Sequence, residues 1–550
     1  MDIIKNQDYE IEIEDMTMTG EGVGKIDGYA LFVKDAIPGD RIIAKVIKTK
    51  KNYGYGRLMK IITPSPDRVD APCPVAKRCG GCTLMAMSYE KQLEFKNKLI
   101  RNNLERIGGL KDVELPPVIG MENPFRYRNK AQFPVGRDKD GNIVMGFYAG
   151  HSHNIVECDD CIIGSDVNAG ILAKIKEYML RFNVSPYEES LHKGLVRHVL
   201  IRVGYTTGEI MVCLVINGTS LSHEKELVKM LKTLSFSNDR KIASIMLNYN
   251  KEKTNVILGN ECRLLDGKPY IEDYIGDIRY QISPLSFYQV NPVQTKKLYD
   301  LALDFAGLTG NETVWDLYCG IGTISLFLAQ RAKKVYGVEI IPQAIENAKN
   351  NAIINNISNA EFFVGKAEEV LPKKYEEEQI YAEVIVVDPP RKGCDEVLLD
   401  TMVKMQPQRI VYVSCDSATL ARDLKYLTGN GYEVVKVQGV DQFGFSGHVE
   451  TVVLLSQRKA DDYIEVDLEL DELDLTSAEN KATYAEIKDY VLKEHGLKVS
   501  NLYISQVKRK CGIEVGENYN LPKSEESRQP QCPEEKEKAI RDALEHFGMV

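Results

Sequence analysis

The sequence predicts an α/β protein of several domains, with a Rossmann-like, doubly wound and mostly parallel sheet in its second half. From residue 294 onward, five short apolar runs alternate with helical segments, which is typical of parallel strands with helices on both faces. Residues 8–62 contain short strands punctuated by glycines, which is typical of a small OB-like β-barrel. The length of 550 residues gives each domain enough chain for a core of its own.

The composition is that of an ordinary folded protein, with 43% hydrophobic and 27% charged residues. No apolar run approaches the ~18 residues that a membrane helix needs. The N-terminus is acidic and lacks the apolar core of a secretory signal, so we expect a cytoplasmic protein. Its 12 cysteines therefore indicate reduced thiols, a metal site or catalysis rather than a disulfide scaffold.

The formal charge of -10 is unevenly distributed along the chain. Residues 461–550 hold 21 acidic and 12 basic side chains, so the remainder is nearly neutral. Residues 41–60 contain basic side chains and no acid: Arg41, Lys45, Lys48, Lys50, Lys51, Arg57 and Lys60. Because local patches decide whether phosphate binds, the acidic total does not exclude a nucleic-acid partner.

The order of elements predicts four domains. Residues 1–62 form the barrel, whose basic final hairpin suits nucleic-acid binding, although lysines that only solvate an edge strand are an equal alternative. Residues 63–275 form a central α+β domain, with helices over 88–108 and 167–182. Residues 276–458 form the Rossmann-like domain, and 459–550 form an acidic linker and a small helical extension.

A glycine turn after the first parallel strand predicts a nucleoside-binding site. In WDLYCGIGT, the turn through Gly320 and Gly322 leads into a helix, and Glu339 ends the next strand 19 residues after Gly320. Glycines allow close approach of a ligand, and a carboxylate at that interval can accept both ribose hydroxyls. Because the full G-x-G-x-x-G is absent, S-adenosylmethionine is favoured over a dinucleotide.

Two further strands end in chemically reactive side chains. VIVVDPPRKG places Asp388 at a strand end, followed by Arg391 where amino-group methyltransferases have an aromatic residue, which argues against N-methylation. VYVSCD places Cys415 after another strand, where we interpret it as a nucleophile rather than a buried apolar group. GHVETVVLL places Glu450 where a loop becomes a strand.

The motifs SFYQVNP, DLYCGIGT, DPPRKG, SCDSATLARD and GHVETVVLL, in this order, resemble the RNA (uracil-5-)-methyltransferases of the RumA/TrmA family. The resemblance covers about residues 1–458, because the barrel looks like that family's TRAM domain. Asp416 and Ser417 stand where many members have Asn-Pro. The resemblance implies that Cys415 is the nucleophile and Glu450 the general base. It also implies that S-adenosylmethionine contacts Gln289, Tyr318, Glu339 and Asp388.

Closely spaced cysteines predict a metal site in the central domain. Cys73, Cys79 and Cys82 lie in CPVAKRCGGC, and VECDDC offers Cys161 or its neighbour Cys158 as a fourth thiol. The spacing fits structural zinc as well as an iron–sulfur cluster. The family resemblance favours a [4Fe-4S] cluster on Cys73, Cys79, Cys82 and Cys161, with zinc as the alternative.

Two more segments have features of RNA contact. Residues 124–137 carry Arg126, Arg128, Lys130 and Arg137 among aromatic residues, a pattern suited to phosphates and unpaired bases or, equally, to a half-buried strand. In the extension, residues 463–475 alternate acidic and aliphatic, and TSAE at 476–479 is a capping box. Segments 482–496 and 502–512 then form either a helix-turn-helix, with Lys508, Arg509 and Lys510, or a partner-docking module.

The sequence thus predicts a monomeric methyltransferase that makes 5-methyluridine in RNA. Because the rRNA branch has both barrel and cysteine cluster, 23S rRNA is favoured as substrate. The alternatives are tRNA uracil-5-methylation and, in another class, a non-catalytic iron–sulfur RNA-binding protein. The extension is expected to bind RNA or protein, and no membrane is involved.

Overall fold

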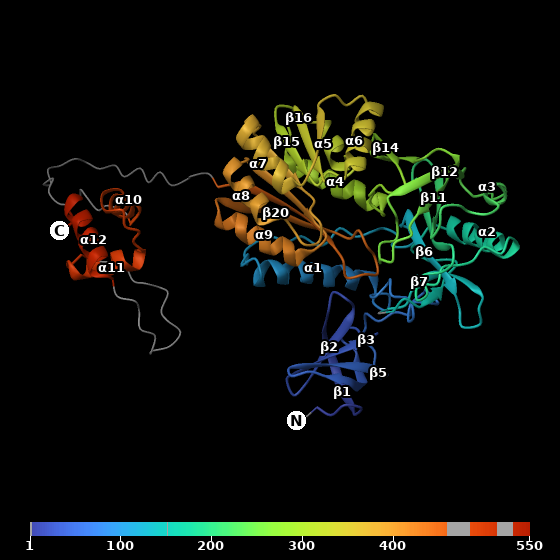
Figure 1. The fold of residues 1–550 in the computed structure, drawn as a ribbon. Helices are drawn as coiled ribbons and strands as arrows, with labels where there is room; N and C mark the ends of the chain where they lie inside the picture. The colour runs from blue at the N-terminus through green and yellow to red at the C-terminus, as the bar shows by residue number, and fades with distance from the viewer. Residues whose placement is uncertain (1–2, 151, 459–483, 514–531) are drawn as a thin grey trace. The chain divides into compact units, whose positions relative to one another are not determined.

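The computed structural model describes residues 3–150, 152–458, 484–513 and 532–550 (Figure 1). The chain divides into two compact units, Met1–Asp461 and Asp462–Val550. Because residues 1–461 form one unit, the domain boundaries drawn within it remain predictions. The acidic–aliphatic stretch 463–475 and the capping box at 476–479 lie outside the described residues. No helix in the described ranges is both long and apolar enough to cross a membrane.

The N-terminal strands close into a barrel, drawn in blue in Figure 1, with the order β1-β2-β3-β5-β4. Alternate side chains fill its interior, among them Ile13, Leu31 and Ile42. The acidic strand β1 pairs with the basic strand β4, which brings Arg41 to Glu10 and Lys45 to Asp8. Part of the basic stretch predicted at 41–60 is therefore neutralised by its neighbour. The strands are β1 (Asp8–Met16), β2 (Glu21–Ile26), β3 (Tyr29–Lys34), β4 (Arg41–Thr49) and β5 (Tyr53–Thr63).

The central region is a seven-stranded mixed sheet in the order β12-β11-β10-β9-β6-β7-β8. Two helices, α2 (Val167–Arg181) and α3 (Glu224–Lys232), cover one face and pack on residues such as Phe133 and Val199. The opposite face, including Leu200 and Met211, shares a core with the following domain. The strands are β6 (Lys130–Arg137), β7 (Ile143–Tyr148), β8 (Ile155–Glu157), β9 (Val196–Val203), β10 (Glu209–Ile216), β11 (Lys241–Tyr249) and β12 (Glu261–Gly267).

The predicted Rossmann-like sheet is present in residues 292–457. Its strand order is β17-β16-β15-β18-β19-β21-β20, in which the first five strands are parallel and β21 runs antiparallel to both of its neighbours, β19 and β20. The hairpin of β13 (Ile271–Ile275) and β14 (Ile278–Ile282) precedes it. Its strands are β15 (Thr313–Leu317), β16 (Lys334–Glu339), β17 (Ala360–Val364), β18 (Val384–Val387), β19 (Arg409–Ser414), β20 (Tyr432–Val440) and β21 (Glu450–Gln457).

Helices cover both faces of this sheet, as a doubly wound fold requires. One core contains residues of the first three helices of the domain, and the other contains residues of the last three and of α1 (Tyr89–Arg106). The helix predicted at 88–108 therefore packs on the Rossmann-like domain, where Asn103 donates to the Ser417 hydroxyl at 2.8 Å. The helices are α4 (Pro292–Ala306), α5 (Thr323–Ala329), α6 (Pro342–Ile354), α7 (Ala367–Glu378), α8 (Glu396–Met405) and α9 (Ser417–Gly429).

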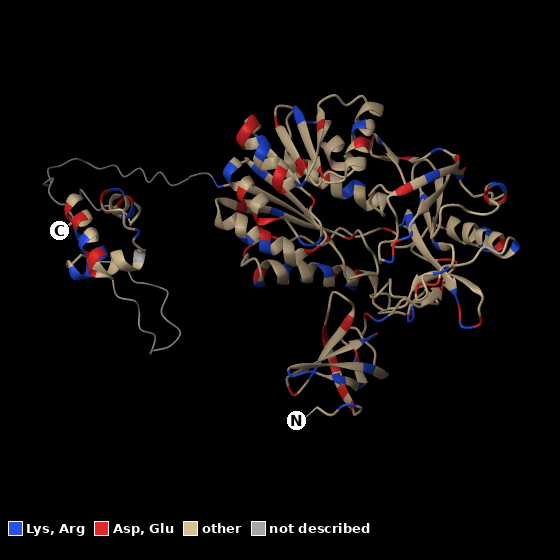
Figure 2. Ribbon diagram, viewed as in Figure 1, with Lys and Arg blue, Asp and Glu red and all other residues tan. Residues whose placement is uncertain are grey.

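The C-terminal unit packs three helices, α10 (Tyr484–His495), α11 (Asn501–Lys510) and α12 (Glu534–His546), around a small apolar core. The first two occupy the segments predicted to be helical, while α12 was not predicted. Figure 2 shows acidic and basic side chains mixed along these helices. Lys508 is buried with its ammonium over the Tyr484 ring, and Lys510 pairs with Glu537 of α12. Two of the three basic side chains at the end of α11 therefore make contacts within the C-terminal unit.

Candidate active site

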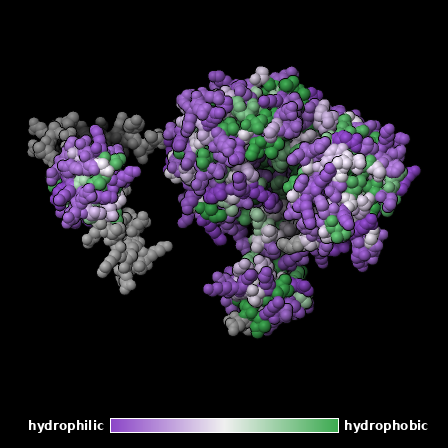
Figure 3. All heavy atoms as spheres, viewed as in Figure 1, coloured by the Kyte–Doolittle hydropathy of each residue, from purple (hydrophilic) through white to green (hydrophobic). Residues whose placement is uncertain are grey.

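A cavity of about 840 Å³ lies at the carboxyl edge of the Rossmann-like sheet. Figure 3 shows a hollow in the unit Met1–Asp461, between the Rossmann-like domain and the central domain. The cavity is lined by every residue predicted to hold cofactor or perform catalysis: Gln289, Tyr318, Glu339, Asp388, Cys415 and Glu450. We call this cavity the active-site pocket. The sequence therefore identified side chains that the fold does bring together.

Parallel strands explain most of this convergence. Tyr318 follows β15, Glu339 ends β16, and Asp388 follows β18. Cys415 follows β19, the next strand in the sheet. Because the carboxyl ends of parallel strands meet at one edge, their terminal side chains share that edge.

Glu450 reaches the same edge by a different route. It is the first residue of β21, which runs antiparallel to β19, and the register pairs Ser414 with Thr451. The start of β21 therefore lies beside the end of β19, and Glu450 lies near Cys415. The Glu450 side chain is buried, with only 3% of the residue exposed.

The electrostatics of the pocket favour the protonated forms of these groups. Burial, followed by the carboxylates of Glu450 and Asp388, raises the pKa of Cys415 to about 11, and Arg391 opposes this shift. Burial also raises the pKa of Asp388 and of Glu450, and for Glu450 the charge of Asp388 adds to the effect. Cys415 is therefore mainly protonated near neutral pH, whereas the positive charge of Arg391 favours its thiolate form.

The opposite end of the pocket has the form of a nucleoside site. Gly320 has a φ of +56°, and a Cβ placed there would meet no described atom within 4 Å, so ligand atoms have room to approach. The Glu339 carboxylate accepts the backbone N–H groups of Gly320 at 3.2 Å and Ile341 at 3.0 Å. These bonds fix a carboxylate beside the glycine turn, as ribose recognition requires. Gln289 is buried and accepts from the Gln442 amide at 3.3 Å.

The lining residues that were not identified from the sequence as parts of the site include Arg391, Phe443 and His448. Arg391 lies 3.4 Å from His448, measured from Nη2 to Nε2. Burial lowers the pKa of His448, and the positive charge of Arg391 lowers it further. Two features of the sequence could have identified them: Arg391 directly follows Asp-Pro-Pro, and His448 lies two residues before Glu450.

The loop between β20 and β21 carries Phe443 and His448, and α1 anchors it. The Lys96 ammonium lies 2.5 Å from Asp441 Oδ1, both side chains being fully buried, and donates to the Phe443 carbonyl at 3.0 Å. The Tyr89 hydroxyl donates to the other Asp441 oxygen at 2.6 Å. A buried ion pair of this kind holds one wall of the pocket in place.

The predicted metal-ligand cysteines gather in one region of the central domain. Burial raises the pKa of Cys82 to about 12, with the nearby thiols of Cys161, Cys79 and Cys73 adding to the shift. Burial, followed by the thiols of Cys161, Cys73 and Cys79, raises the pKa of Cys158 to about 12 as well, so this competitor of Cys161 also lies near the group. Nevertheless, across the described residues no group of three or more His, Cys, Asp or Glu side chains could hold a metal ion as positioned.

The basic segment 124–137 contributes to a neighbouring cavity of about 480 Å³, which we call the cysteine-side cavity. Arg128 and Lys130 line it together with Cys79, Cys82 and Cys161. Burial, followed by the charges of Arg202 and Arg128, lowers the pKa of Lys130 to about 7. Arg126 instead pairs with Asp160, and Arg137 donates to a turn carbonyl. Only part of the predicted basic stretch therefore faces this cavity.

Comparisons with known proteins agree on one family. A family model described as tRNA (uracil-5-)-methyltransferase matches residues 88–458, and a TRAM domain model matches residues 5–59. An uncharacterized RNA methyltransferase of Halalkalibacterium halodurans is 52% identical over 452 residues, covering 82% of this chain and 97% of that one. One from Clostridium tetani is 50% identical over 452 residues, covering 82% and 97%.

A solved structure shows the same likeness. The Pyrococcus abyssi tRNA (uracil-54, C5)-methyltransferase, in complex with S-adenosyl-L-homocysteine, has a TM-score of 0.64 and 28% identity. The match covers 81% of this chain and 100% of that chain.

Proposed function

Because the chain belongs to the tRNA (uracil-5-)-methyltransferase family, we propose that it methylates C5 of a uridine in RNA, using S-adenosylmethionine and a covalent Cys415 adduct. The observation that carries the proposal is the single pocket lined by Cys415, Glu450 and a ribose-type carboxylate, Glu339. The structural neighbour was solved with S-adenosyl-L-homocysteine, which supports the same cofactor class here. The open space at Gly320 and the fixed Glu339 carboxylate fit the nucleoside part of that cofactor.

The chemistry requires a nucleophile and a base on the same uracil. C5 of uracil is a weak nucleophile, so the Cys415 thiolate adds to C6, and the C5–C6 double-bond electrons pass into an enolate through C5 and O4. S-adenosylmethionine, when bound, would supply an electrophilic methyl group to C5, with its methyl–sulfur bond breaking and S-adenosylhomocysteine as the leaving group. The Glu450 carboxylate then removes the C5 proton, the double bond re-forms, and the C6–S bond breaks to release Cys415 as thiolate.

The other charged side chains of the pocket influence the protonation states of Cys415 and Glu450 during these reaction steps. Cys415 must lose its proton before it adds, and Arg391 is the lining cation that opposes the raised pKa of the thiol. Burial, followed by the charge of Asp388, raises the pKa of Glu450, so Glu450 is a stronger base than an exposed carboxylate. The uracil must leave any stacked structure to enter this pocket, so the target is a flipped or looped-out base.

For the substrate, we propose 23S rRNA, on the basis of the barrel and the cysteine-rich central domain. The structural neighbour favours tRNA as the second candidate, because a tRNA enzyme matches along its whole length and covers 81% of this chain. The match covers more of this chain than the central and Rossmann-like domains together, so it extends into the barrel. Because a tRNA enzyme therefore matches the barrel as well, the barrel discriminates only weakly between rRNA and tRNA as substrate. The barrel's basic strands support RNA binding in either case.

For the cysteines, we propose a [4Fe-4S] cluster held by Cys73, Cys79, Cys82 and Cys161, with zinc as the alternative metal. Thiols suit both metals, and their mutual influence on pKa places them near one another. The methylation needs no redox step, so a cluster would support the fold or the RNA contact. Iron and sulfide in anaerobically purified protein, lost in Cys82→Ser, would support the cluster. Stoichiometric zinc would support the alternative, and the absence of any metal would contradict both.

The test of the proposed function maps 5-methyluridine by mass spectrometry in 23S rRNA and tRNA from a strain lacking the gene. Loss of the modification from 23S rRNA, restored by the wild-type gene and not by Cys415→Ala, supports the first proposal. Loss from tRNA alone supports the second. Unchanged 5-methyluridine in both RNAs would contradict the proposed function and favour the alternative, a non-catalytic RNA-binding protein.

A further inference from the structure

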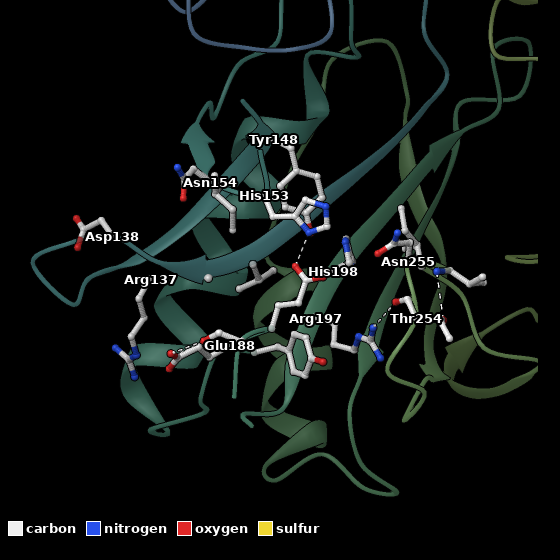
Figure 4. A pocket seen from close by; sticks show the side chains of 18 of the residues that line it. Arg137, Asp138, Tyr148, His153, Asn154, Glu188, Arg197, His198, Thr254 and Asn255 are labelled. Atoms are coloured by element: carbon white, nitrogen blue, oxygen red, sulfur yellow. Dashed lines mark hydrogen bonds and ion pairs between the residues drawn. The ribbon is translucent and has the colours of Figure 1, made fainter. Parts of the chain in front are cut away.

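A third cavity, of about 920 Å³, lies on the central sheet and takes no part in the proposed chemistry (Figure 4). We call it the sheet cavity. Its walls come from β6, β7 and β9 and from two loops, 187–190 and 254–257. The close view shows Tyr148, His153 and His198 near one another, with Thr254 and Asn255 approaching from a separate segment.

His198 is the feature of this cavity that points to a ligand. It lies on β9, only 7% of the residue is exposed, and neither ring nitrogen has a hydrogen-bond partner among the described residues. Burial and the charge of Arg197 lower its pKa to about 4, so the ring is neutral at physiological pH, with one donor and one acceptor. Buried polar atoms are nearly always paired, so a histidine in the wall of a cavity with both ring nitrogens unpaired indicates a missing partner.

Aromatic rings beside His198 suit a flat ligand. Tyr148 and His153 are stacked, with ring centroids 5.1 Å apart and planes at 28°, and the Tyr148 ring lies edge-on to His198 at 6.5 Å. The His153 ring is also held by Glu189, with 2.6 Å between Nδ1 and Oε2. These contacts fix a pair of rings at the wall of the cavity, on which another planar ring could stack.

The charges of the wall are mixed and partly fixed. The Arg197 guanidinium lies 4.6 Å from the Tyr187 ring centroid and donates to the carbonyl oxygens of Asn250 and Glu252 at 2.8 Å. Arg137 and Lys139 line the cavity, as do the carboxylates of Glu188 and Glu189. Acidic groups among the basic ones argue against a phosphate groove and for a base, whose amino groups carboxylates can bind.

The sheet cavity lies in a row of cavities that share wall residues and end at the active site. Ile257 lines both the sheet cavity and the cysteine-side cavity. Arg391, Phe443 and His448 in turn line both the cysteine-side cavity and the active-site pocket. The three cavities therefore adjoin one another, with Arg128 and Lys130 in the wall of the middle one, so different nucleotides of one RNA lie within reach of all three.

We propose that the sheet cavity binds a second unpaired nucleobase of the RNA substrate, separate from the uridine that is methylated. This inference rests on the proposed function, since it assigns a further subsite for the same RNA. The base stacks on the Tyr148–His153 pair and hydrogen-bonds to one nitrogen of His198. Single-stranded segments are recognised by such combinations of stacking and edge hydrogen bonds.

The first test needs no catalysis. Wild-type protein is irradiated at 254 nm with rRNA and tRNA extracted from a strain lacking the gene, and nucleotide adducts are mapped by mass spectrometry. We expect adducts on the peptide carrying Tyr148 and His153 as well as in the active-site pocket. Adducts in the active-site pocket without any on residues 137–155 or 187–198 would overturn the proposal.

The second test measures the Kd of the same RNAs and, with methylation active, KM and kcat. Tyr148→Ala and His198→Leu should each weaken RNA binding about tenfold and raise KM, with kcat unchanged, the size expected for one stacked or hydrogen-bonded base. His198→Asn keeps a donor and an acceptor and should retain most of the affinity. Tyr205→Ala is the matched control, because Tyr205 is 64% exposed in the same domain and does not line the cavity.

The outcomes separate this proposal from the proposed function. Leu replaces an unpaired buried ring, so His198→Leu should fold at least as well as the wild type, and Tyr148→Ala tests the same cavity from its rim. Affinity changes below twofold for both variants would refute the subsite. If the wild-type protein methylates no RNA, the proposed function fails, while the cavity is still judged by adducts and Kd.

Discussion

Replacing Lys96 by Met should destabilise the Rossmann-like domain strongly, although Lys96 lies outside it in sequence. The Lys96 ammonium is fully buried 2.5 Å from Asp441 Oδ1, and it also donates to the Phe443 carbonyl. Met is similar in length and fills the same space, so the variant removes the cation and leaves the Asp441 carboxylate buried without it. Breaking a buried pair in this way costs about 3–5 kcal/mol.

The chain contains a natural probe and a matched control for this experiment. Trp315 is the only tryptophan and is fully buried in β15, so its fluorescence in urea reports the unfolding of the Rossmann-like sheet. Lys98 lies on the same helix and pairs with Asp15 at 3.0 Å, but both side chains are about half exposed. Lys98→Met should therefore lower the free energy of unfolding by at most about 1 kcal/mol.

A second substitution tests the cause of the loss. Asp441→Asn in the Lys96→Met background removes the isolated charge, while the amide can still accept from the Tyr89 hydroxyl, so part of the stability should return. The loop that carries Phe443 and His448 should loosen in Lys96→Met, lowering methylation more than Lys98→Met does. A change below about 1 kcal/mol in Lys96→Met, or no recovery in the double variant, would refute the reasoning.

Three other predictions concern single groups. Alkylation of Cys415 by iodoacetamide, followed on its peptide by mass spectrometry, should rise about tenfold per pH unit between pH 7.5 and 9.5, because its pKa is raised to about 11; Arg391→Gln should slow it at each pH, and a plateau below pH 9 would contradict the raised pKa. Glu339→Gln should weaken binding of S-adenosylhomocysteine about 10–100-fold by calorimetry, the range expected for charged hydrogen bonds, and unchanged affinity would exclude Glu339 from the site. Burial opposes ionisation of Asp40, but Arg68 and the N–H groups of Ile37 and Ser65 hold its pKa below the usual value. Because its pKa is depressed, ionised Asp40 stabilises the barrel at pH values above the unfolded-state pKa, and this stabilisation is lost as pH falls through the folded-state pKa. Asp40→Asn should therefore lower the free energy of opening of β1–β5 at pH 7 by about 1–3 kcal/mol, measured as faster amide exchange. Equal exchange in the two proteins at pH 7 would be evidence against this role.

The sequence was informative where local pattern and sheet geometry coincide. Glu339, Asp388 and Cys415 could be placed at one edge because each follows an apolar strand run, and parallel strands align their carboxyl ends. The glycine turn before α5 could be recognised for the same reason. The second half of the chain was therefore predictable in both fold and site.

Contacts between distant segments could not be predicted in this way. Lys96 and Asp441 are 345 residues apart, and neither lies in a motif. The basic stretch at 41–60 was considered without β1, whose acids pair with Arg41 and Lys45. In the central sheet β9 is buried along its whole length, so periodicity does not distinguish His198 from its apolar neighbours. Its role depends on a cavity that only the folded sheet and two loops create.

The central claim, that Cys415 forms a covalent bond with the target uracil, is tested most directly with 23S rRNA and tRNA transcripts containing 5-fluorouridine. Fluorine at C5 cannot be removed as a proton is, so the C6–S bond cannot break after methyl transfer. With S-adenosylmethionine present, the wild-type protein should form a denaturant-resistant complex whose nucleotide maps to the Cys415 peptide, and Cys415→Ala should form none. A complex that persists in Cys415→Ala, or 5-methyluridine formed by that variant on unmodified RNA, would contradict the account.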